Sequence, residues 1–227
     1  MKNLTQYITE KLVLKRNIKV KDYNYRPKTH DDLKTLVNAL IEERGRNANL
    51  NDIDVSGITD MSGIFNVSEF NGDISEWDVS NVTNMEYMFS YSKFNGDISE
   101  WNVSNVTNMN NMFYYSIFNN DISGWDVRNV KNMMQLFGYS VFDEDISNWD
   151  VSNVEKMQYM FYKSKFTGKN GDISGWDVRN VKNMSWMFTN SKFEGDLSKW
   201  DVDNVIKMDG IFDNCPIKEE YKPKFKD

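Results

Sequence analysis

The amino-acid sequence predicts a repeat solenoid in which seven coils of 24 residues stack behind an N-terminal helical cap. One observation behind this prediction is a phrase that recurs almost unchanged, as FNGDISEWDVSNVTNMEYMF at 70–89 and FNGDISEWNVSNVTNMNNMF at 94–113. A weaker copy begins near Leu50, so the coils are expected to span 50–215. The other observation is the spacing of six tryptophans, which is 24 residues except for one gap of 27, where the stretch 167–170 adds residues: Trp77, Trp101, Trp125, Trp149, Trp176 and Trp200.

Each coil combines two hydrophobic spacings. Ile74, Trp77 and Val79 form an I-x-x-W-x-V pattern that corresponds to the strand half of a leucine-rich repeat. The apolar residues from Val82 to Phe89 then recur at i, i+3, i+6 and i+7, which is typical of a helical turn. We therefore expect a leucine-rich-repeat-like solenoid with one short strand and one helical turn per coil. A single coil cannot bury its own apolar face, so stacking is required.

Two polar residue types recur at fixed places in the coils. An asparagine such as Asn81 follows each predicted strand, and it is expected to bond backbone groups of its own and the neighbouring coil. An aspartate precedes each strand, and carboxylates stacked about 4.8 Å apart repel one another unless turn N–H groups or a cation neutralise them. Both turn capping and calcium binding stay open, although the chain lacks a dense D-x-[DN]-x-[DN]-G loop. The calcium candidates are Asp73, Asp97, Asp121, Asp145, Asp172 and Asp196.

A helical cap is expected at 29–49. Thr29 is a candidate N-cap residue, acidic residues occupy the first turn, and an apolar stripe at helical spacing precedes Gly45. These signals predict a helix over 30–44. Because a solenoid needs its ends covered, we expect this helix to lie across the open face of the first coil.

The two ends of the chain differ in character from the repeats. Residues 1–28 form a basic arm in which a short amphipathic helix is expected, and its three candidate roles are a docking tag, a nucleic-acid-binding arm, or part of the cap. The tail at 216–227 breaks the repeat at Pro216 and is expected to cover the last coil. Open solenoid ends can stack, so the oligomeric state stays open, with a dimer by end stacking as one candidate.

Charge and rare residue types narrow the function classes. The formal net charge is -7, and residues 1–30 contribute +6, so the rest of the chain carries -13. An acidic body repels phosphate, so nucleic acid is not an expected partner. The single histidine, His30, and the single cysteine, Cys215, provide neither a metal-ligand set nor a plausible catalytic triad. Equivalent aspartates also lack the pKa asymmetry of paired catalytic carboxylates. We expect no enzymatic activity and no cofactor.

No targeting or membrane segment stands out. The opening residues lack the apolar region of a signal peptide, and no stretch approaches the roughly 20 apolar residues of a membrane span. The chain as given is therefore expected in the cytoplasm. The alternative is the virion or the cell surface, if a leader was removed.

Two sets of outward-facing residues are candidates for binding a partner. Three tyrosines in register, Tyr91, Tyr115 and Tyr139, and an outward tryptophan, Trp186, lie on the predicted helical side. The alternative is that these rings only finish the packing at the coil edges. The other set varies from coil to coil on the predicted strand face, where a fixed framework leaves side-chain identity free: Glu76, Asp78, Glu100, Arg128, Asp150, Arg179 and Lys199.

The unit F-N-x-D-I-S-x-W-D-V-S-N-V-x-N-M-x-x-M-F resembles the repeat of BspA-like leucine-rich-repeat surface proteins. It is similar to the branch first noted in mycoplasma lipoproteins as a repeat of unknown function. The resemblance covers about 50–215 and implies a solenoid that binds or adheres, with no catalytic residues to carry over. This chain departs from the family at one position, where serines such as Ser92 replace a frequent cysteine and only Cys215 keeps the thiol.

The sequence therefore predicts a non-catalytic recognition scaffold that binds a protein partner through the repeat surface. The alternative is a structural or adhesive component of a virion or cell surface, with glycan as a candidate ligand. A glycan binder predicts aromatic rings exposed in a row, whereas a protein binder predicts a mixed charged and aromatic patch.

Overall fold

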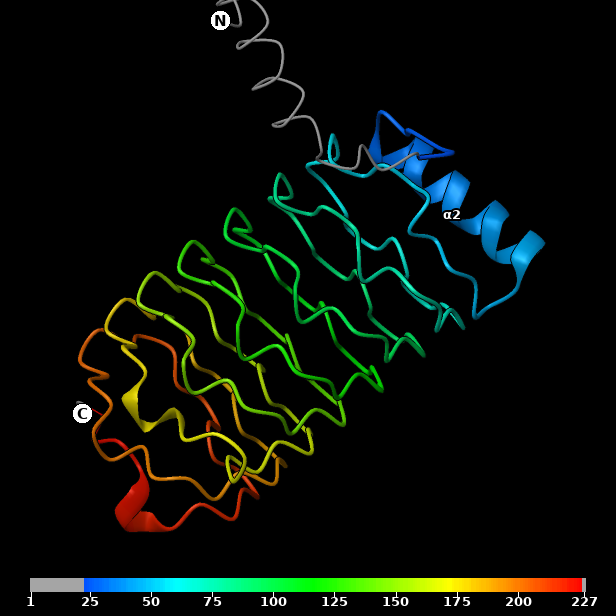
Figure 1. Cartoon of the computed structure of the whole chain (residues 1–227). Helices are drawn as coiled ribbons and strands as arrows, with labels where there is room; N and C mark the ends of the chain where they lie inside the picture. The colour runs from blue at the N-terminus through cyan, green and yellow to red at the C-terminus, as the bar shows by residue number, and fades with distance from the viewer. Residues whose placement is uncertain (1–22, 226–227) are drawn as a thin grey trace, which may run out of the picture.

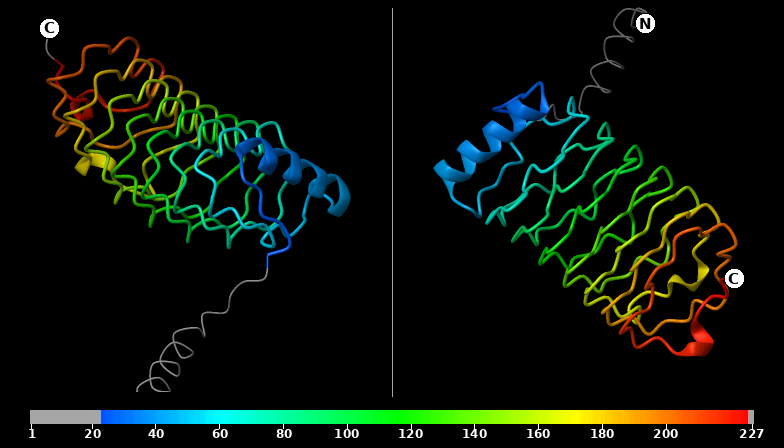
Figure 2. Two further views of the ribbon diagram at one scale, coloured as in Figure 1. Left: turned by 90° about the horizontal axis from the view of Figure 1, so that it is seen from above. Right: turned by 180° about the vertical axis from the view of Figure 1, so that it is seen from behind.

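The computed structural model describes residues 23–225. In this part of the chain the backbone winds as successive coils, one behind another, and α2 (His30–Arg44) lies across the N-terminal end of the stack (Figures 1 and 2). The other helices among the described residues are two short 3-10 turns, η1 (Ile173–Gly175) and η2 (Glu219–Tyr221), and no strand is present there. The amphipathic helix predicted in the basic arm falls within 1–22, outside the described residues.

Parallel backbone bridges join each coil to the next. They connect residues 24 positions apart, with one step of 27 between Lys156 and Asn183. On the same segment, the Met85 N–H donates to the Asn108 carbonyl oxygen at 2.9 Å, and equivalent bonds recur between later coils. We call this set of backbone bonds the ladder. Its bridged column has one member per coil: Asp60, Asn84, Asn108, Asn132, Lys156, Asn183 and Lys207.

The elements within each coil differ from those predicted. The I-x-x-W-x-V segment forms turns rather than a strand, since the Trp77 N–H bonds the Ile74 carbonyl oxygen at 3.1 Å. The ladder lies instead on the segment predicted to be helical, where every second N–H from Met85 to Tyr91 donates to the next coil. The prediction of a strand followed by a helical turn is therefore wrong in both segments. A row of tight turns brings apolar residues inward at the same i, i+3 spacing as a helix, which explains the second error.

Side chains rather than backbone groups link the coils on the tryptophan side. The Trp101 indole N–H donates to the Ile74 carbonyl oxygen of the preceding coil at 3.2 Å, and the Asn105 side-chain amide donates to the Ser80 carbonyl oxygen at 2.7 Å. Both bonds recur in the other coils. The predicted role of the asparagine column, bonding to the neighbouring coil, is confirmed.

The coils lie closer together on the ladder side than on the tryptophan side. Ring centroids of Trp77 and Trp101 are 6.4 Å apart, whereas those of Tyr91 and Tyr115 are 4.9 Å apart. Backbone bonds hold neighbouring levels about 4.8 Å apart, while a side-chain donor can reach across a wider gap. The spacing between neighbouring coils therefore increases from the ladder toward the tryptophans, so the ladder lies on the inner side of a curved stack.

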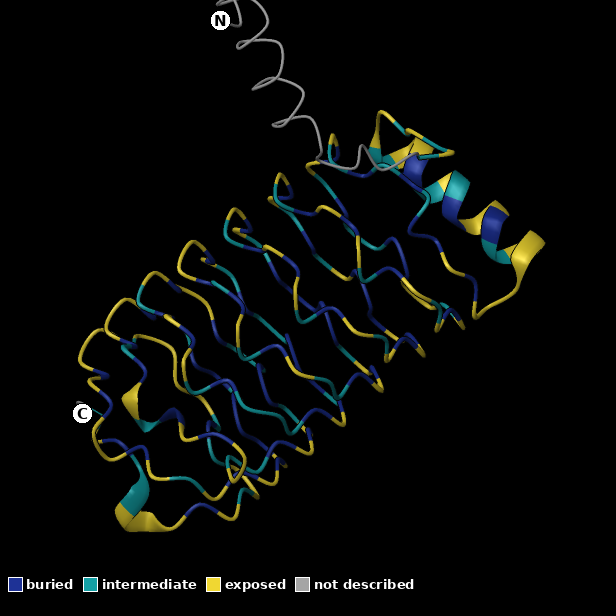
Figure 3. Cartoon of the chain, viewed as in Figure 1, coloured by how far each residue is buried: buried dark blue, intermediate teal, exposed yellow. Residues whose placement is uncertain are grey.

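The interior is filled by columns of like side chains. Buried positions recur in one coil after another along the chain (Figure 3). Met85, Phe89 and Phe94 are fully buried, as are their equivalents in the next two coils. The Phe65 and Phe89 rings stack with centroids 5.5 Å apart and planes 1° from parallel. Such identical neighbours at each level give a continuous core through the stack, as expected for coils that cannot bury their own apolar face.

Helix α2 closes the N-terminal end. The Thr29 hydroxyl accepts the Asp32 N–H at 3.1 Å, and the Asp32 carboxylate accepts the Thr29 N–H at 3.1 Å, which makes a capping box. Gly45 ends the helix with φ 87°. The predicted helix at 30–44 with its Thr29 and Gly45 ends is confirmed. The side chains that it buries against the first coil are Leu33, Val37 and Leu40.

The described end of the basic arm pairs with the first coil. The Asn24 N–H bonds the Asp52 carbonyl oxygen at 2.9 Å, and the Asp54 N–H bonds the Tyr25 carbonyl oxygen at 2.8 Å. Residues 23–28 are therefore part of the cap, whereas the candidate roles of the arm as a docking tag or a nucleic-acid arm rest on residues outside the described range.

The C-terminal end is covered in part. The Leu197 N–H donates to the Tyr221 carbonyl oxygen at 2.8 Å, and Ile217 is buried. On the ladder side of the last coil, by contrast, Ile206 and Met208 are exposed. The three-residue insertion disturbs the stack little, because the Trp176 indole still reaches the Ile146 carbonyl oxygen at 3.2 Å.

Candidate functional site

A row of stacked tyrosines lies beside the ladder. Ring centroids are 4.9 Å apart for Tyr91 and Tyr115 and 4.3 Å apart for Tyr115 and Tyr139, with planes 7° and 17° from parallel. Tyr91 and Tyr115 are 49% and 45% exposed. We call Tyr91, Tyr115 and Tyr139 the tyrosine row. The structure thus brings together three of the four aromatic candidates that the sequence singles out.

The tyrosine row stands on left-handed backbone. The φ angles are 53° at Tyr91, 55° at Tyr115 and 56° at Tyr139. This conformation costs a non-glycine residue on the order of 1–2 kcal/mol. A glycine stands in the other left-handed column of the ladder, but only in the first and seventh coils, at Gly63 and Gly210. The middle coils therefore carry larger side chains in both left-handed columns, although glycine would adopt this backbone with less strain.

Neighbouring side chains fix the edges of the row. Tyr114 packs edge-on against Tyr91 and Tyr139, at centroid distances of 5.4 and 5.7 Å. Burial of the Tyr114 hydroxyl, followed by its contact with Tyr91, raises the pKa of Tyr114 to about 12. Lys163 follows in the next coil, with its ammonium 5.1 Å from the Tyr139 ring centroid. Val67 holds the equivalent left-handed position in the first coil and is exposed, so the row runs from an apolar neighbour to a cation.

Trp186 belongs to a second aromatic pair. Its ring stacks on Tyr159 with centroids 5.0 Å apart, and both residues have left-handed backbone. Tyr159 also packs edge-on against Tyr162, which contacts Tyr139 of the tyrosine row. The fourth aromatic candidate is therefore connected to the row through Tyr162, and the aromatic surface continues over several coils.

The candidates on the tryptophan side are mostly engaged in local turns. Asp78 accepts the Ser80 N–H at 3.1 Å, and Asp150 caps its own turn in the same way. Arg128 pairs with Asp126 at 2.7 Å. Arg179 likewise pairs with Asp177. Lys199 is exposed. Glu76 and Glu100 line a cavity of about 300 Å³ with Ser75 and Asp97.

Turn capping explains the aspartate column. The Asp73 carboxylate accepts the Ser75 N–H at 3.0 Å, and the Asp97 carboxylate accepts the Ser99 N–H at 2.9 Å. The same bond, at 2.8 Å, recurs at the other four positions, Asp121, Asp145, Asp172 and Asp196. This confirms the capping interpretation of the column. Residues 23–225 contain no group of three or more His, Cys, Asp or Glu side chains that could hold a metal ion.

Two isolated chemical groups lie at the ends of the stack. His30 contacts the Asp31 carboxylate and the Ser62 carbonyl oxygen, at 2.9 and 2.8 Å. Cys215 is half-buried, and burial raises the pKa of its thiol. No helix in the described range combines the length and the apolar character that a membrane crossing needs.

Sequence reasoning missed the left-handed backbone of the ladder. A signal was present in its columns, because glycine or asparagine occupies several of these positions, including Gly63, Asn111, Asn190, Gly210 and Asn214. These residue types adopt left-handed backbone most readily. Tyrosine at the equivalent positions concealed the pattern.

The recurring coil, its ladder and its uniform columns define a repeat protein. The family described as "Mycoplasma protein of unknown function, DUF285" matches residues 34–141 and again residues 116–222. Together these matches cover 189 of the 227 residues, and the chain belongs to this family. No curated protein and no solved structure matches the chain.

Proposed function

We propose that this repeat protein is a non-catalytic recognition scaffold that binds a protein partner through the tyrosine row. We further propose that its stack is a leucine-rich-repeat-like solenoid of the BspA-like kind, with the ladder in place of the strands. The observation that carries the functional proposal is the row itself, since tyrosines persist in three consecutive coils on strained backbone, with Tyr91 and Tyr115 exposed and Tyr139 half-buried. Strain of this kind is retained where the side chain has a use.

The position of the row supports recognition. It lies beside the ladder, on the side where the coils are closest together, and repeat proteins use concave surfaces for binding. Tyrosine provides large contact area at a low entropic cost, because few of its torsions need to be fixed. The underlying backbone is held by bonds to the next coil, such as that from the Tyr91 N–H to the Tyr114 carbonyl oxygen at 2.8 Å.

The ring geometry favours a protein over a glycan. Tyr115 is sandwiched between Tyr91 and Tyr139, so both faces of its ring are covered. A sugar that stacks on an aromatic side chain needs a free ring face. The patch also combines the apolar Val67 with the cationic Lys163, which matches the mixed surface expected of a protein binder.

The function can be tested by replacing the row with the residue that the chain uses in the same column. Asn190 and Asn214 hold equivalent left-handed positions, so the triple variant Tyr91→Asn, Tyr115→Asn and Tyr139→Asn should fold. A protein captured from a lysate by the wild type would be purified and titrated by calorimetry. We expect the triple variant to weaken its binding at least about tenfold, because the aromatic contacts are lost.

The matched control is the variant Lys93→Gln, Lys165→Gln and Lys192→Gln, which changes three exposed lysines. Lys93 lies two residues after Tyr91, and Lys165 and Lys192 hold the equivalent positions in later coils. This control should bind like the wild type. Equal binding by the triple tyrosine variant would contradict the proposal. Binding of a glycan array that depends on the same tyrosines would instead support the alternative, an adhesive component of a virion or cell surface.

A further inference from the structure

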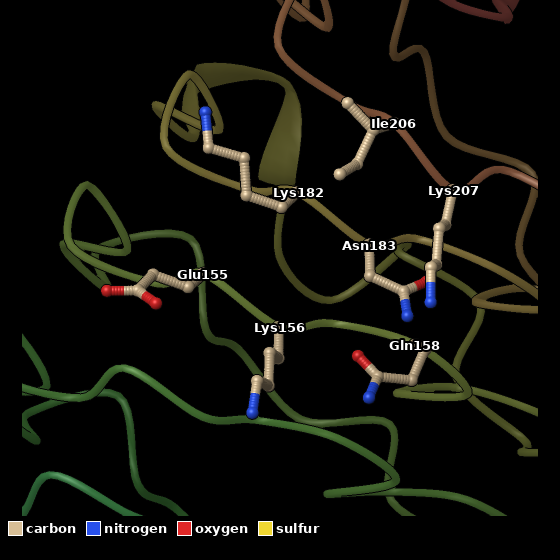
Figure 4. A pocket seen from close by; sticks show the side chains of 7 residues that line it. All are labelled: Glu155, Lys156, Gln158, Lys182, Asn183, Ile206 and Lys207. Carbon is tan, nitrogen blue, oxygen red and sulfur yellow. The ribbon is translucent and has the colours of Figure 1, made fainter.

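A groove lined by lysines runs beside the ladder in the last four coils. One cavity of about 300 Å³ is lined by Lys156, Lys182 and Lys207 among others, and Figure 4 shows their side chains around it. A neighbouring cavity of about 350 Å³ is lined by Lys131 and shares Lys182 with the first. Because Glu155 also lines both cavities, the two lie next to each other, and together we call them the lysine groove.

The lysine groove is a basic site on an acidic body. Its four lysines and one glutamate, Glu155, give a formal charge of about +3, although the chain beyond residue 30 carries -13. Within residues 23–225 no ion pair or side-chain hydrogen bond engages the ammonium groups of these lysines. By contrast, Arg128 and Arg179 are each paired with an aspartate of their own turn.

The fold does not require lysine at these positions. In earlier coils the Thr107 hydroxyl donates to the Thr83 carbonyl oxygen at 3.1 Å, in the column that Lys131 and Lys182 continue. In the adjacent column, Asn132 accepts the Met134 N–H at 3.1 Å. Lysine offers no acceptor for such a cap. The later coils therefore give up structural hydrogen bonds in exchange for free positive charges, which points to a ligand.

The groove also has polar and apolar elements. Ile206 is 76% exposed at one end. Gln158 lines the groove with a buried side-chain carbonyl oxygen that has no hydrogen-bond partner among the described residues. An unpaired buried acceptor is unfavourable, so a side-chain rotation that turns this oxygen toward an N–H group of a ligand would be stabilising. The side-chain amides of the groove can bond a peptide backbone, Ile206 can contact an apolar side chain, and the separated lysines can pair with carboxylates. The groove therefore matches the groups of a polypeptide.

We propose that the lysine groove binds an extended acidic peptide segment of a protein partner, with carboxylates against the lysines and an apolar side chain against Ile206. The four coils span about 14 Å at a ladder spacing of about 4.8 Å, which matches about five extended residues. This proposal shares with the proposed function only the protein nature of the partner, and it does not depend on the tyrosine row.

Polyphosphates and sulfated glycans fit the groove less well. Glu155 stands between Lys131 and Lys182 and would repel a continuous row of anionic groups. Single-stranded nucleic acid is held mainly by stacking on aromatic rings, and no aromatic residue lines either cavity. A peptide can instead place a neutral residue opposite the glutamate.

The test uses the full chain and a fluorescent peptide of about ten residues in which Glu alternates with Ser and a Leu stands near one end, a length that exceeds the groove. The lysines are replaced by residues of the earlier coils, as Lys131→Thr, Lys156→Asn, Lys182→Thr and Lys207→Asn. We expect the wild type to bind the peptide, in a salt-dependent manner, and the quadruple variant to bind at least about tenfold more weakly. The same peptide with Gln in place of Glu should not bind.

Controls separate the groove from net charge and from the tyrosine row. The variant Lys93→Gln, Lys165→Gln, Lys192→Gln and Lys224→Gln changes the net charge equally and should bind like the wild type, as should the triple tyrosine variant. The single reversal Lys182→Glu should also weaken binding, which keeps the test decisive if the quadruple variant unfolds. The proposal is overturned if the wild type does not bind the peptide, if both quadruple variants lose binding equally, or if heparin or oligodeoxythymidylate binds the same lysines more tightly.

Discussion

The Lys34 ammonium donates to the Ile64 carbonyl oxygen at 2.8 Å, and this contact closes one edge of the ladder. Inside the stack, an equivalent carbonyl, that of Met88, accepts the Phe65 N–H of the preceding coil. The first coil has no coil before it, so α2 supplies donors from side chains. His30, one helical turn earlier, reaches the Ser62 carbonyl oxygen in the same way.

The ladder therefore has a direction. From Met85 to Tyr91, and in the equivalent segments, its N–H groups point toward the C-terminal end and its carbonyl groups toward α2, as the bond from the Met85 N–H to the Asn108 carbonyl oxygen shows. The bond just before this segment, from the Thr83 N–H to the Thr59 carbonyl oxygen, runs the other way. Aligned peptide dipoles leave the α2 end partly negative, which suits the two basic side chains placed there. A second copy cannot continue the ladder at this end unless α2 is displaced.

Replacing Lys34 with methionine should destabilise the protein. Lys34→Met keeps the aliphatic contacts but leaves the Ile64 carbonyl oxygen without its donor, at a cost of about 1–2 kcal/mol in the free energy of unfolding. Urea denaturation measures the change. Glu42→Met, on an exposed position of the same helix, is the control and should change stability by less than about 0.5 kcal/mol. Equal losses in the two variants would show that the Lys34 contact does not hold the cap.

The His30 contact predicts a pH dependence of the cap. The hydrogen bond to Asp31, followed by that to Ser62, raises the pKa of His30 above its ordinary value of 6.5. A raised folded-state pKa gives stabilisation that is complete below pH 6.5 and is lost as the pH rises through the folded-state pKa. The difference in melting temperature between the wild type and His30→Gln should therefore shrink from pH 5.5 to pH 8.5. A difference that does not change with pH would contradict this assignment.

The tryptophan side predicts unequal costs for two inter-coil bonds. Trp101→Phe removes a buried indole donor and leaves the Ile74 carbonyl oxygen unpaired, so we expect a loss of about 2–4 kcal/mol. Asn105→Ala removes an exposed donor to the Ser80 carbonyl oxygen, which water can replace, so about 1 kcal/mol is expected. Chemical denaturation of both variants gives the comparison. The reverse order would mean that the asparagine column, rather than the indoles, joins the coils.

The period, the buried columns and the cap could all be predicted from the sequence because each depends on local spacing. Thr29, Asp32 and Gly45 identify the ends of α2, and the tryptophans count the coils. The hydrogen-bonding partner of each segment could not be predicted in this way. Inward-facing residues such as Met85 and Phe89 are compatible with a helix or with successive turns, and only the bonds to the next coil decide between them.

The residues of the candidate site could be predicted from the sequence, but the surface that they form together could not. Register placed Tyr91, Tyr115 and Tyr139 in one column, but their face-to-face stacking depends on the closer spacing of the coils on that side. The lysine groove was missed because Lys131 and Lys182 stand in different coils and look like ordinary solvated residues in the sequence. Their significance appears only beside the hydrogen bonds that threonine makes in the same column.

The left-handed column that contains Gly63 and Gly210 predicts a stabilising substitution. Gln135 has φ 55° in the column where the first and seventh coils carry Gly63 and Gly210. Gln135→Gly should relieve backbone strain and raise the free energy of unfolding by about 0.5–1 kcal/mol, after the entropic cost of glycine is subtracted. Glu155→Gly, at an exposed residue without left-handed backbone, is the control and should destabilise. Destabilisation by both variants, measured in urea, would show that the backbone at Gln135 is not strained.

The aspartate column predicts acid lability without a metal. The hydrogen bond from the Ser123 N–H is the main cause that lowers the pKa of Asp121, and the Ser198 N–H acts in the same way on Asp196. A depressed folded-state pKa gives stabilisation that is present above the ordinary value of 3.8 and is lost as the pH falls through the folded-state pKa. Melting temperature should therefore fall as the pH drops below about 4. Asp121→Asn keeps the accepting oxygen without the charge, and it should reduce this slope while preserving the fold at neutral pH.

The same measurements decide between turn capping alone and an additional calcium ion. In each aspartate of the column, one carboxylate oxygen already accepts a hydrogen bond from a turn N–H group, as Asp73 does from Ser75. Calcium needs six to eight oxygen ligands, and one carboxylate per level provides few of them. We expect calorimetric titration with calcium to give no heat and the melting temperature at neutral pH to stay constant. A calcium-dependent rise in melting temperature that Asp121→Asn abolishes would instead make the column a metal site, with capping as its apo arrangement.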